Sequence, residues 1–180
     1  MTPLPLPGDD DAAESMARML RVDHAGEYGA QRIYAGQLAV LKNDAAAGEI
    51  RTMAAQEEAH LAEFNRLLVA RRVRPSALLP FWHVAGFALG AGTALLGSKA
   101  AMACTVAVES VIAEHYANQI NRLPQSEAAL GATLTKFRAE EMEHHDTGLA
   151  HGAEATPAYP LLTAAIRRGC KAAIWLAERV

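Results

Sequence analysis

One metal-ligand pattern occurs twice in this chain, and it constrains the fold more than any other feature. Each copy has a single glutamate followed, 30 or 32 residues later, by a glutamate and a histidine three positions apart. The two copies are Glu27 with Glu57 and His60, and Glu109 with Glu141 and His144. Residues three positions apart share one face of a helix, so each pair can reach one metal ion. Four carboxylates and two imidazoles are the ligand set of di-iron carboxylate proteins, in which four bundled helices supply the ligands.

The composition suits one helical domain. The chain has 180 residues, of which 51% are apolar and only 6% aromatic, so it is long enough to bury a sizeable core. A net charge of −3 gives no support for nucleic-acid binding. The two cysteines, Cys104 and Cys170, form no C-x-x-C motif, which excludes a zinc ribbon or rubredoxin-type site. We expect both thiols to be reduced and to pack as small apolar groups.

Helical periodicity interrupted by prolines predicts four long helices. Their expected spans are residues 11–43, 45–72, 99–123 and 125–151. Pro75 and Pro124 end the second and third, because the residue before a proline disfavours helical dihedral angles. Residues 76–98 form a separate apolar stretch, and a last helix is expected from about Pro160 to about residue 180. No segment has the sustained alternation of a β-strand.

This order predicts an all-α, ferritin-like four-helix bundle with an apolar crossover helix and an extra C-terminal helix. Residues 1–10 are proline-rich and are predicted to form a flexible N-terminal tail, without the pattern of a targeting peptide. Residues 11–180 are predicted to form a single di-iron carboxylate domain, with a membrane-contacting segment at about 76–98. The ligand positions of the two halves are offset by 82 or 84 residues, which suggests a distant duplication.

The candidate ligands differ from the other acids by their place on apolar helix faces. On each long helix, residues at three- and four-residue spacing form an apolar row with a glutamate in its middle, and the first row also contains Tyr34. Four unpaired carboxylates in such rows would repel one another, whereas multivalent cations would neutralise them. The acids that fall mostly off the rows are predicted to lie on solvated faces: Glu49, Glu58, Glu63, Glu114, Glu127, Glu140 and Glu143.

Spacing leaves two further histidines to consider. His145 lies four residues after Glu141 and is not excluded as a ligand, although symmetry between the two motifs favours His144. His24 lies one turn before Glu27 and is predicted to be a core histidine near the site rather than a ligand. Oxygen and imidazole ligands suit iron or manganese. The competing interpretation is a bundle with buried acid–histidine pairs and no metal, which would be unstable for its size.

Long stretches around these residues closely resemble the demethoxyubiquinone hydroxylase family of ubiquinone biosynthesis. They are residues 21–37 (RVDHAGEYGAQRIYAGQ), 56–61 (QEEAHL), 89–108 (LGAGTALLGSKAAMACTVAV) and 137–149 (FRAEEMEHHDTGL). The likeness extends from about residue 16 to the C-terminus. By this resemblance the terminal iron ligands are Glu27 and Glu109, the bridges are Glu57 and Glu141, and the imidazole ligands are His60 and His144.

The resemblance also implies catalytic roles for His115 and Tyr116, which match a pair linked to substrate and electron transfer in the family. The alternative for Tyr116 is a core aromatic with a satisfied hydroxyl. The implied reaction is hydroxylation of the demethoxyubiquinol ring to demethylubiquinol, with two iron ions as cofactor and O2 and NADH as co-substrates. Another ferritin-like di-iron oxidase, a ferroxidase or iron-storage protein, and a metal-free lipid-binding scaffold are the competing functions.

The implied partners are a polyprenylated quinol, a membrane lipid surface and a lipid-binding accessory protein, and we expect a homo-oligomer and no nucleic acid. The expected location is peripheral, on the cytoplasmic side of the cell inner membrane, or on the matrix side of the mitochondrial inner membrane for an organellar protein. Residues 77–97 are apolar, with Arg74 and Lys99 as cationic flanks. This segment is expected to lie in the membrane interface. A crossover helix buried in the bundle or in a dimer contact and a membrane span are the alternatives.

Overall fold

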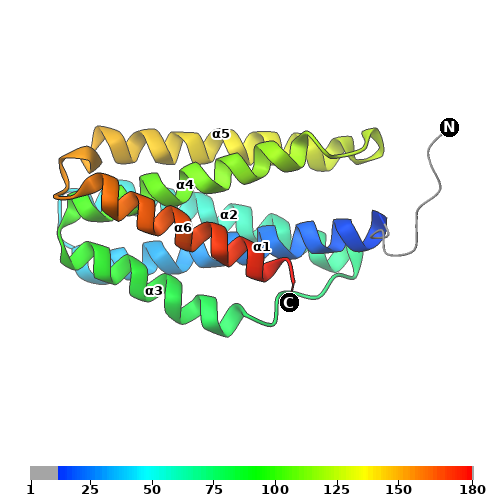
Figure 1. Cartoon of the computed structure of the whole chain (residues 1–180), viewed down its shortest axis with the longest axis horizontal. Coiled ribbons are helices and arrows are strands. Elements are labelled where there is room, and N and C mark those ends of the chain that lie inside the picture. Colours follow the sequence, from blue (N-terminus) through cyan, green and yellow to red (C-terminus); the bar gives the residue numbers. More distant parts are fainter. Residues whose placement is uncertain (1–11, 180) are drawn as a thin grey trace.

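The computed structural model describes residues 12–179, and within them the chain forms six α-helices, two 3-10 turns and no strand. The helices are α1 (Ala12–Leu41), α2 (Ala47–Arg71), α3 (Leu79–Leu95), α4 (Ser98–Ile120), α5 (Ala128–Ala150) and α6 (Tyr159–Ala177). Successive helices run antiparallel along the long axis of the molecule (Figure 1). Helices α1, α2, α4 and α5 form the bundle, while α3 packs against α1, and α6 against α4. The predicted fold class is confirmed; the tail predicted at 1–10 lies outside the described residues.

The helix ends follow local backbone chemistry. Helix α2 stops because Arg72 adopts a left-handed conformation with φ 54°, and its N–H donates to the carbonyl of Val69 at 3.2 Å. Pro75 then prevents the helix from resuming. The fourth bundle helix begins three residues later than predicted, because Gln125–Glu127 form a 3-10 turn after Pro124. The apolar stretch 76–98 contains α3, which carries the chain back along the bundle from the end of α2 to the start of α4.

Helix α3 lies so close to α1 that two positions require glycine. A Cβ atom on Gly90 would lie 1.9 Å from the carbonyl oxygen of Ile33. One on Gly36 would lie 2.2 Å from the carbonyl oxygen of Phe87. The two backbones are therefore in direct contact, which any larger residue would prevent.

The other side of α3 is exposed. Its large apolar side chains that face outward are Phe81, Val84 and Leu95, followed by Leu96 just beyond the helix. Among the helices of residues 12–179, none combines the length and the apolar character needed to cross a membrane.

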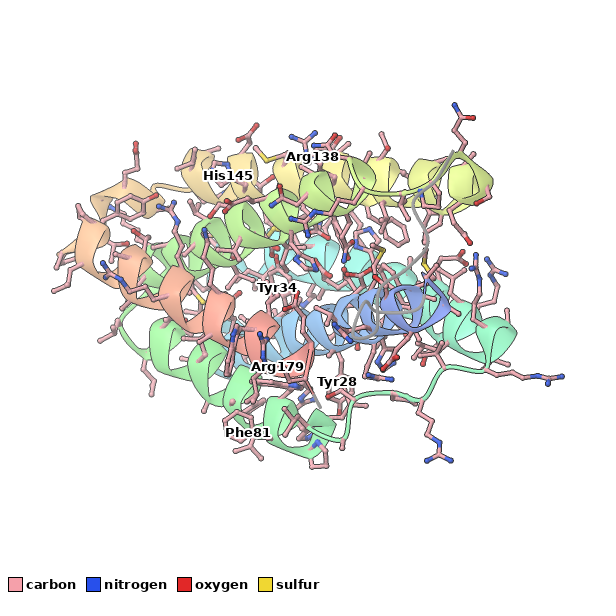
Figure 2. The ribbon with its side chains drawn as sticks, turned by 45° about the vertical axis from the view of Figure 1, so that its right-hand side comes forward. Tyr28, Tyr34, Phe81, Arg138, His145 and Arg179 are labelled. Carbon is pink, nitrogen blue, oxygen red and sulfur yellow. The ribbon has the colours of Figure 1, made fainter. Side chains whose placement is uncertain are left out.

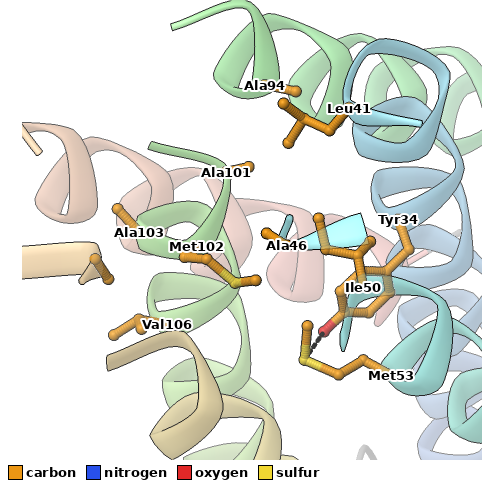
Figure 3. Packing of buried hydrophobic residues seen from close by; sticks show 11 residues of the cluster. Tyr34, Leu41, Ala46, Ile50, Met53, Ala94, Ala101, Met102, Ala103 and Val106 are labelled. Carbon is orange, nitrogen blue, oxygen red and sulfur yellow. Dashed lines mark hydrogen bonds between the residues drawn. The ribbon is translucent and has the colours of Figure 1, made fainter. Parts of the chain in front are cut away.

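Apolar clusters fill the bundle on both sides of a polar central layer. One cluster, drawn in Figure 3, lies where α1 ends and α2 begins and includes Leu41, Ile50, Met53 and Met102. A second lies toward the start of α1 and the end of α2 and includes Leu20, Phe64, Leu134 and Phe137. Helix α4 is buried at every position from 100 to 109, because α1, α3, α5 and α6 all contact it. The candidate ligands occupy the layer between these clusters.

Candidate metal centre

The structure brings all six predicted ligand side chains together in the middle of the bundle, and each of these residues is at most 1% exposed. Helices α1 and α4 supply one glutamate each, and α2 and α5 each supply a glutamate and a histidine. The side chains form two groups whose candidate ligand atoms lie within 4.8 Å of one another. The groups are Glu27, Glu57, His60 and Glu141, and Glu57, Glu109, Glu141 and His144. Because two glutamates belong to both groups, the geometry fits two ions bridged by Glu57 and Glu141.

Both histidine rings turn the same nitrogen toward the carboxylates. His60 Nδ1 lies 3.1 Å from Glu141 Oε1 and 3.4 Å from Glu27 Oε2. His144 Nδ1 lies 3.2 Å from Glu57 Oε1 and 3.2 Å from Glu141 Oε2. A histidine three positions after a glutamate thus presents Nδ1 to the shared space, and leaves Nε2 facing away from it.

The chemistry of these atoms fits metal ions. Most of the carboxylate oxygens and both Nδ1 atoms of the six residues are buried, and they have no aligned hydrogen-bond partner within residues 12–179. Orphaned polar atoms are costly in a protein interior, and here they converge on one space rather than scattering through the core. Divalent cations would satisfy them all, and the oxygen and imidazole donors suit iron or manganese. The residues present therefore fit a dinuclear metal centre.

When no metal is bound, protons would balance part of the charge of the centre. Burial and the negative charges of Glu141 and Glu27 raise the pKa of Glu57 well above its ordinary value. Burial and the charges of Glu141 and Glu57 do the same for Glu109. Burial also acts to raise the pKa of Glu141, but the close Nδ1 groups of His144 and His60 outweigh it and lower that pKa to about 2. The pKa values of both histidines are raised, because their carboxylate neighbours outweigh the effect of burial.

Two tyrosines hold the outer glutamates in a reciprocal arrangement. Tyr116, on the helix of Glu109, donates its hydroxyl hydrogen bond to Oε1 of Glu27. Tyr34, on the helix of Glu27, donates to Oε1 of Glu109 at 2.6 Å, and Figure 2 shows Tyr34 between the helices. Each tyrosine follows the glutamate of its own helix by seven residues. The sequence pattern places Tyr34 on the core row but predicts no role for it. The equal seven-residue spacing from each glutamate to its tyrosine could have indicated that Tyr34 and Tyr116 play matching roles.

The outward-facing nitrogens of the histidines also have reciprocal partners. His60 Nε2 lies 2.9 Å from Glu140 Oε2, and His144 Nε2 lies 2.8 Å from Gln56 Oε1. Each partner directly precedes the bridging glutamate of the opposite motif. The prediction that Glu140 lies on a solvated face was therefore wrong, since only 22% of its side chain is exposed and it contacts a ligand ring. Such partners orient metal-bound histidines and increase their basicity. Glu127, also predicted to be solvated, is only 19% exposed because it pairs with Arg71.

The remaining histidines lie outside the centre. His145 is directed away from it and contacts Asp146 at 2.9 Å, so the geometry favours His144 as the ligand. His24 is buried, as predicted, and its Nε2 lies 3.1 Å from Asn65 Oδ1. His115, which the resemblance paired with Tyr116, does not contact the candidate ligands.

His115 instead belongs to a small polar group beside the centre. Its Nε2 lies 3.4 Å from Asp23 Oδ1 and 2.8 Å from the amide nitrogen of Gln119, and 19% of its side chain is exposed. Gln119 also donates to Asp23 at 2.6 Å. Burial raises the pKa of Asp23, although hydrogen bonding with His115 acts in the opposite direction. The group extends from the protein surface to the turn of α1 that precedes Glu27.

An apolar cavity of about 460 Å³ lies beside the centre, between α1, α3, α4 and α6. Small residues of α1 form one wall, including Gly26 and Gly29, and α6 contributes Ile166 and Gly169 to another. Gly26 and Val108 line the cavity and are the chain neighbours of Glu27 and Glu109, so it adjoins the helix turns that carry the outer ligands. Its size is in the range of small-molecule sites.

An all-α bundle that gathers two glutamate–histidine motifs around one buried space defines a ferritin-like helical protein with a candidate dinuclear centre. The family model described as "Ubiquinone biosynthesis protein COQ7" matches residues 14–177, and the chain belongs to this family.

Three curated relatives illustrate the similarity. The 3-demethoxyubiquinol 3-hydroxylase of Rhodospirillum rubrum is 58% identical over 176 residues, covering 97% of this chain and 83% of that protein. The mitochondrial NADPH-dependent 3-demethoxyubiquinone 3-hydroxylase of Bos taurus is 57% identical over 176 residues, covering 96% and 81%. The mitochondrial 5-demethoxyubiquinone hydroxylase of Saccharomyces cerevisiae is 42% identical over 188 residues, covering 95% and 81%. The resemblance noted in the sequence is therefore confirmed.

Proposed function

We propose that this protein hydroxylates the ring of demethoxyubiquinol in ubiquinone biosynthesis, with O2 activated at a di-iron centre. The observation that carries the proposal is the convergence of four buried carboxylates and two Nδ1 atoms on one space beside an apolar cavity. The names of the similar proteins support the reaction and its substrate class. Two iron ions bound by the six residues would supply the O2-reducing chemistry, in which one oxygen atom enters the ring and the other leaves as water.

The side chains around the centre keep the ligands oriented. Tyr34 and Tyr116 each fix one oxygen of an outer glutamate, which leaves the second oxygen free for a metal. Glu140 and Gln56 set the orientation of the histidine rings. The group of His115, Gln119 and Asp23 leads from the surface toward the centre, and it offers a route for the protons that leave as water.

The cavity between α1 and α6 suits the quinol. Its apolar lining would hold the ring and the first part of a polyprenyl chain, and would exclude bulk water from the reaction. The reductant is a reduced nicotinamide nucleotide; the bovine relative is named as NADPH-dependent, whereas the sequence resemblance implied NADH. Electron delivery through the quinol itself would need no nucleotide site on this chain.

Peripheral membrane contact through the exposed side of α3 belongs to the same proposal, because a polyprenyl chain is soluble only in lipid. Phe81, Val84 and Leu95 would enter the interface. The bovine and yeast relatives are named as mitochondrial, and we propose the inner membrane as the surface in bacteria and in mitochondria. In liposome flotation, Phe81→Ser with Leu95→Ser should reduce binding. Val69→Ser on α2, where Val69 is 80% exposed, should have no effect; equal flotation of all variants would contradict the membrane contact.

The reaction is tested with protein stripped of metal and reloaded with Fe²⁺, then given a short-chain demethoxyubiquinol, O2 and a reductant. We expect a product whose mass exceeds that of the substrate by one oxygen atom. When isotopically labelled O2 is used, this oxygen atom should carry the label. Glu57→Ala should lose iron and turnover together, while Glu58→Ala, the exposed neighbour, should keep both. Full turnover by Glu57→Ala would refute the site, and mineral accumulation without product would favour iron storage.

A further inference from the structure

We propose that the two metal positions are unequal, and that the position of Glu27 and His60 binds its ion more tightly and fills first. The inference rests on the di-iron centre proposed above and adds an order of filling to it. It starts from one chemical difference between two positions whose ligands and tyrosine partners are reciprocal. His60 Nε2 faces a carboxylate, Glu140, at 2.9 Å, whereas His144 Nε2 faces the side-chain carbonyl of Gln56 at 2.8 Å.

Both contacts fix the same tautomer but not the same donor strength. With a metal on Nδ1, each ring would carry its hydrogen on Nε2 and donate it outward. A hydrogen bond to a carboxylate is charge-assisted and stronger than one to a neutral amide. It shifts electron density toward Nδ1, so His60 becomes the better metal ligand of the two.

The other neighbours of the two positions match closely. Each outer glutamate accepts one tyrosine hydroxyl, from Tyr116 for Glu27 and from Tyr34 for Glu109. The bridges Glu57 and Glu141 serve both positions. The identity of the residue that precedes each bridge, glutamine in the first motif and glutamate in the second, is therefore the main difference between them.

Two further contacts affect His60 and its partner Glu140. The ring of Phe137 stacks on His60 with centroids 4.0 Å apart, which restricts the ring to one orientation. Lys136 Nζ lies 3.6 Å from Glu140 Oε1, but this lysine is 69% exposed, so solvent screens much of its charge. Glu140 keeps its hydrogen-bonding oxygen Oε2 for His60.

The test is calorimetric titration of the metal-free protein with Mn²⁺ alone, which is stable in air and suits these ligands. The wild type should bind two equivalents with affinities that differ roughly ten- to hundredfold, the range measured when such histidine partners are changed. Glu109→Gln should keep only the tight class and Glu27→Gln only the weak class. These two variants assign each affinity to its position independently of turnover.

Exchanging the histidine partners Gln56 and Glu140 then isolates the effect of each partner on metal affinity. Glu140→Gln should bring the two affinities together by weakening the tight class, and Gln56→Glu should bring them together by strengthening the weak class. The double variant Q56E/E140Q should restore the difference with the positions reversed, so that Glu27→Gln in that background keeps the tight class. Both exchanges preserve side-chain shape, and circular dichroism checks the fold.

The outcomes distinguish the unequal metal positions from the di-iron centre itself. Two equivalents with equal affinity in the wild type, or a ratio that Glu140→Gln and Gln56→Glu leave unchanged, would overturn the unequal positions and leave the di-iron centre intact. A wild type that binds no metal would overturn both. Reversal in the double variant is the result that only the inferred role of Glu140 predicts.

Discussion

The metal-free protein should lose stability as pH rises, and metal should restore it. Candidate ligand atoms within each group lie within 4.8 Å of one another. Two like charges at that separation repel by about 3.5 kcal/mol at an effective dielectric constant near 20. Burial and this repulsion together make the centre retain protons, so the pKa values of Glu57 and Glu109 are raised from 4.5.

The sign follows from proton counting. Between 4.5 and the raised pKa values, the folded state holds protons on Glu57 and Glu109 that the unfolded state has released, so stability falls as pH rises. Above 6.5 the raised pKa values of His60 and His144 act in the same direction. The lowered pKa of Glu141 has the opposite effect, but only below 4.5.

The magnitude is about 1.4 kcal/mol per pH unit for each proton retained, or about 2.7 kcal/mol per unit for the two glutamates. In a chain of this size each kcal/mol shifts Tm by about 2–4 °C. Raising the pH by one unit from about 5.5 should lower the Tm of the metal-free protein by about 5–10 °C. Mn²⁺ at 100 times its Kd should add about 2.7 kcal/mol per site. At one fixed Mn²⁺ concentration the gain should be larger at the higher pH, because fewer protons compete for the ligand atoms.

Thermal unfolding of chelator-treated protein measures these values. Glu57→Gln removes one of the two retained protons and should halve the slope of Tm against pH, whereas Glu58→Gln, on an exposed position, should leave it unchanged. A metal-free Tm that is flat or rises over this range would refute the reasoning. So would an unchanged slope in Glu57→Gln.

Two further predictions concern packing and ligand choice. Gly90→Ala should destabilise the protein by about 1–3 kcal/mol or more in denaturant unfolding, because its Cβ would meet the backbone of Ile33. Gly92→Ala, which has open space, should be neutral or slightly stabilising, and equal effects would contradict the contact between α1 and α3. His144→Ala should lose one metal equivalent by elemental analysis and His145→Ala none; the reverse result would move the ligand to His145.

The sequence was sufficient to predict the fold and to predict that the six ligand candidates lie together, because both predictions depend on local periodicity. A glutamate in the middle of an apolar helical row can face only the interior. Every residue of the row Ile50, Met53, Glu57, His60, Phe64 and Leu67 is buried, as is every residue of the corresponding row on α5. The helix boundaries followed from proline in the same way, within about three residues.

The contacts that surround the ligands depend on tertiary structure and were missed. Glu140 lies beside Glu141 on its helix and was assigned to solvent, yet its partner His60 is 80 residues away in the sequence. Tyr34 and Glu109 are 75 residues apart. The position of α3 also needed the structure, because the sequence predicted a crossover helix but not that Gly36 and Gly90 let its backbone contact α1.

Anomalous diffraction at the iron absorption edge, from crystals of protein loaded with Fe²⁺, tests the central claim most directly. The account predicts two peaks in the middle of the bundle, both contacting Glu57 and Glu141. One peak should also contact Glu27 and His60. A single peak, peaks at the surface, or no iron at these residues would contradict it.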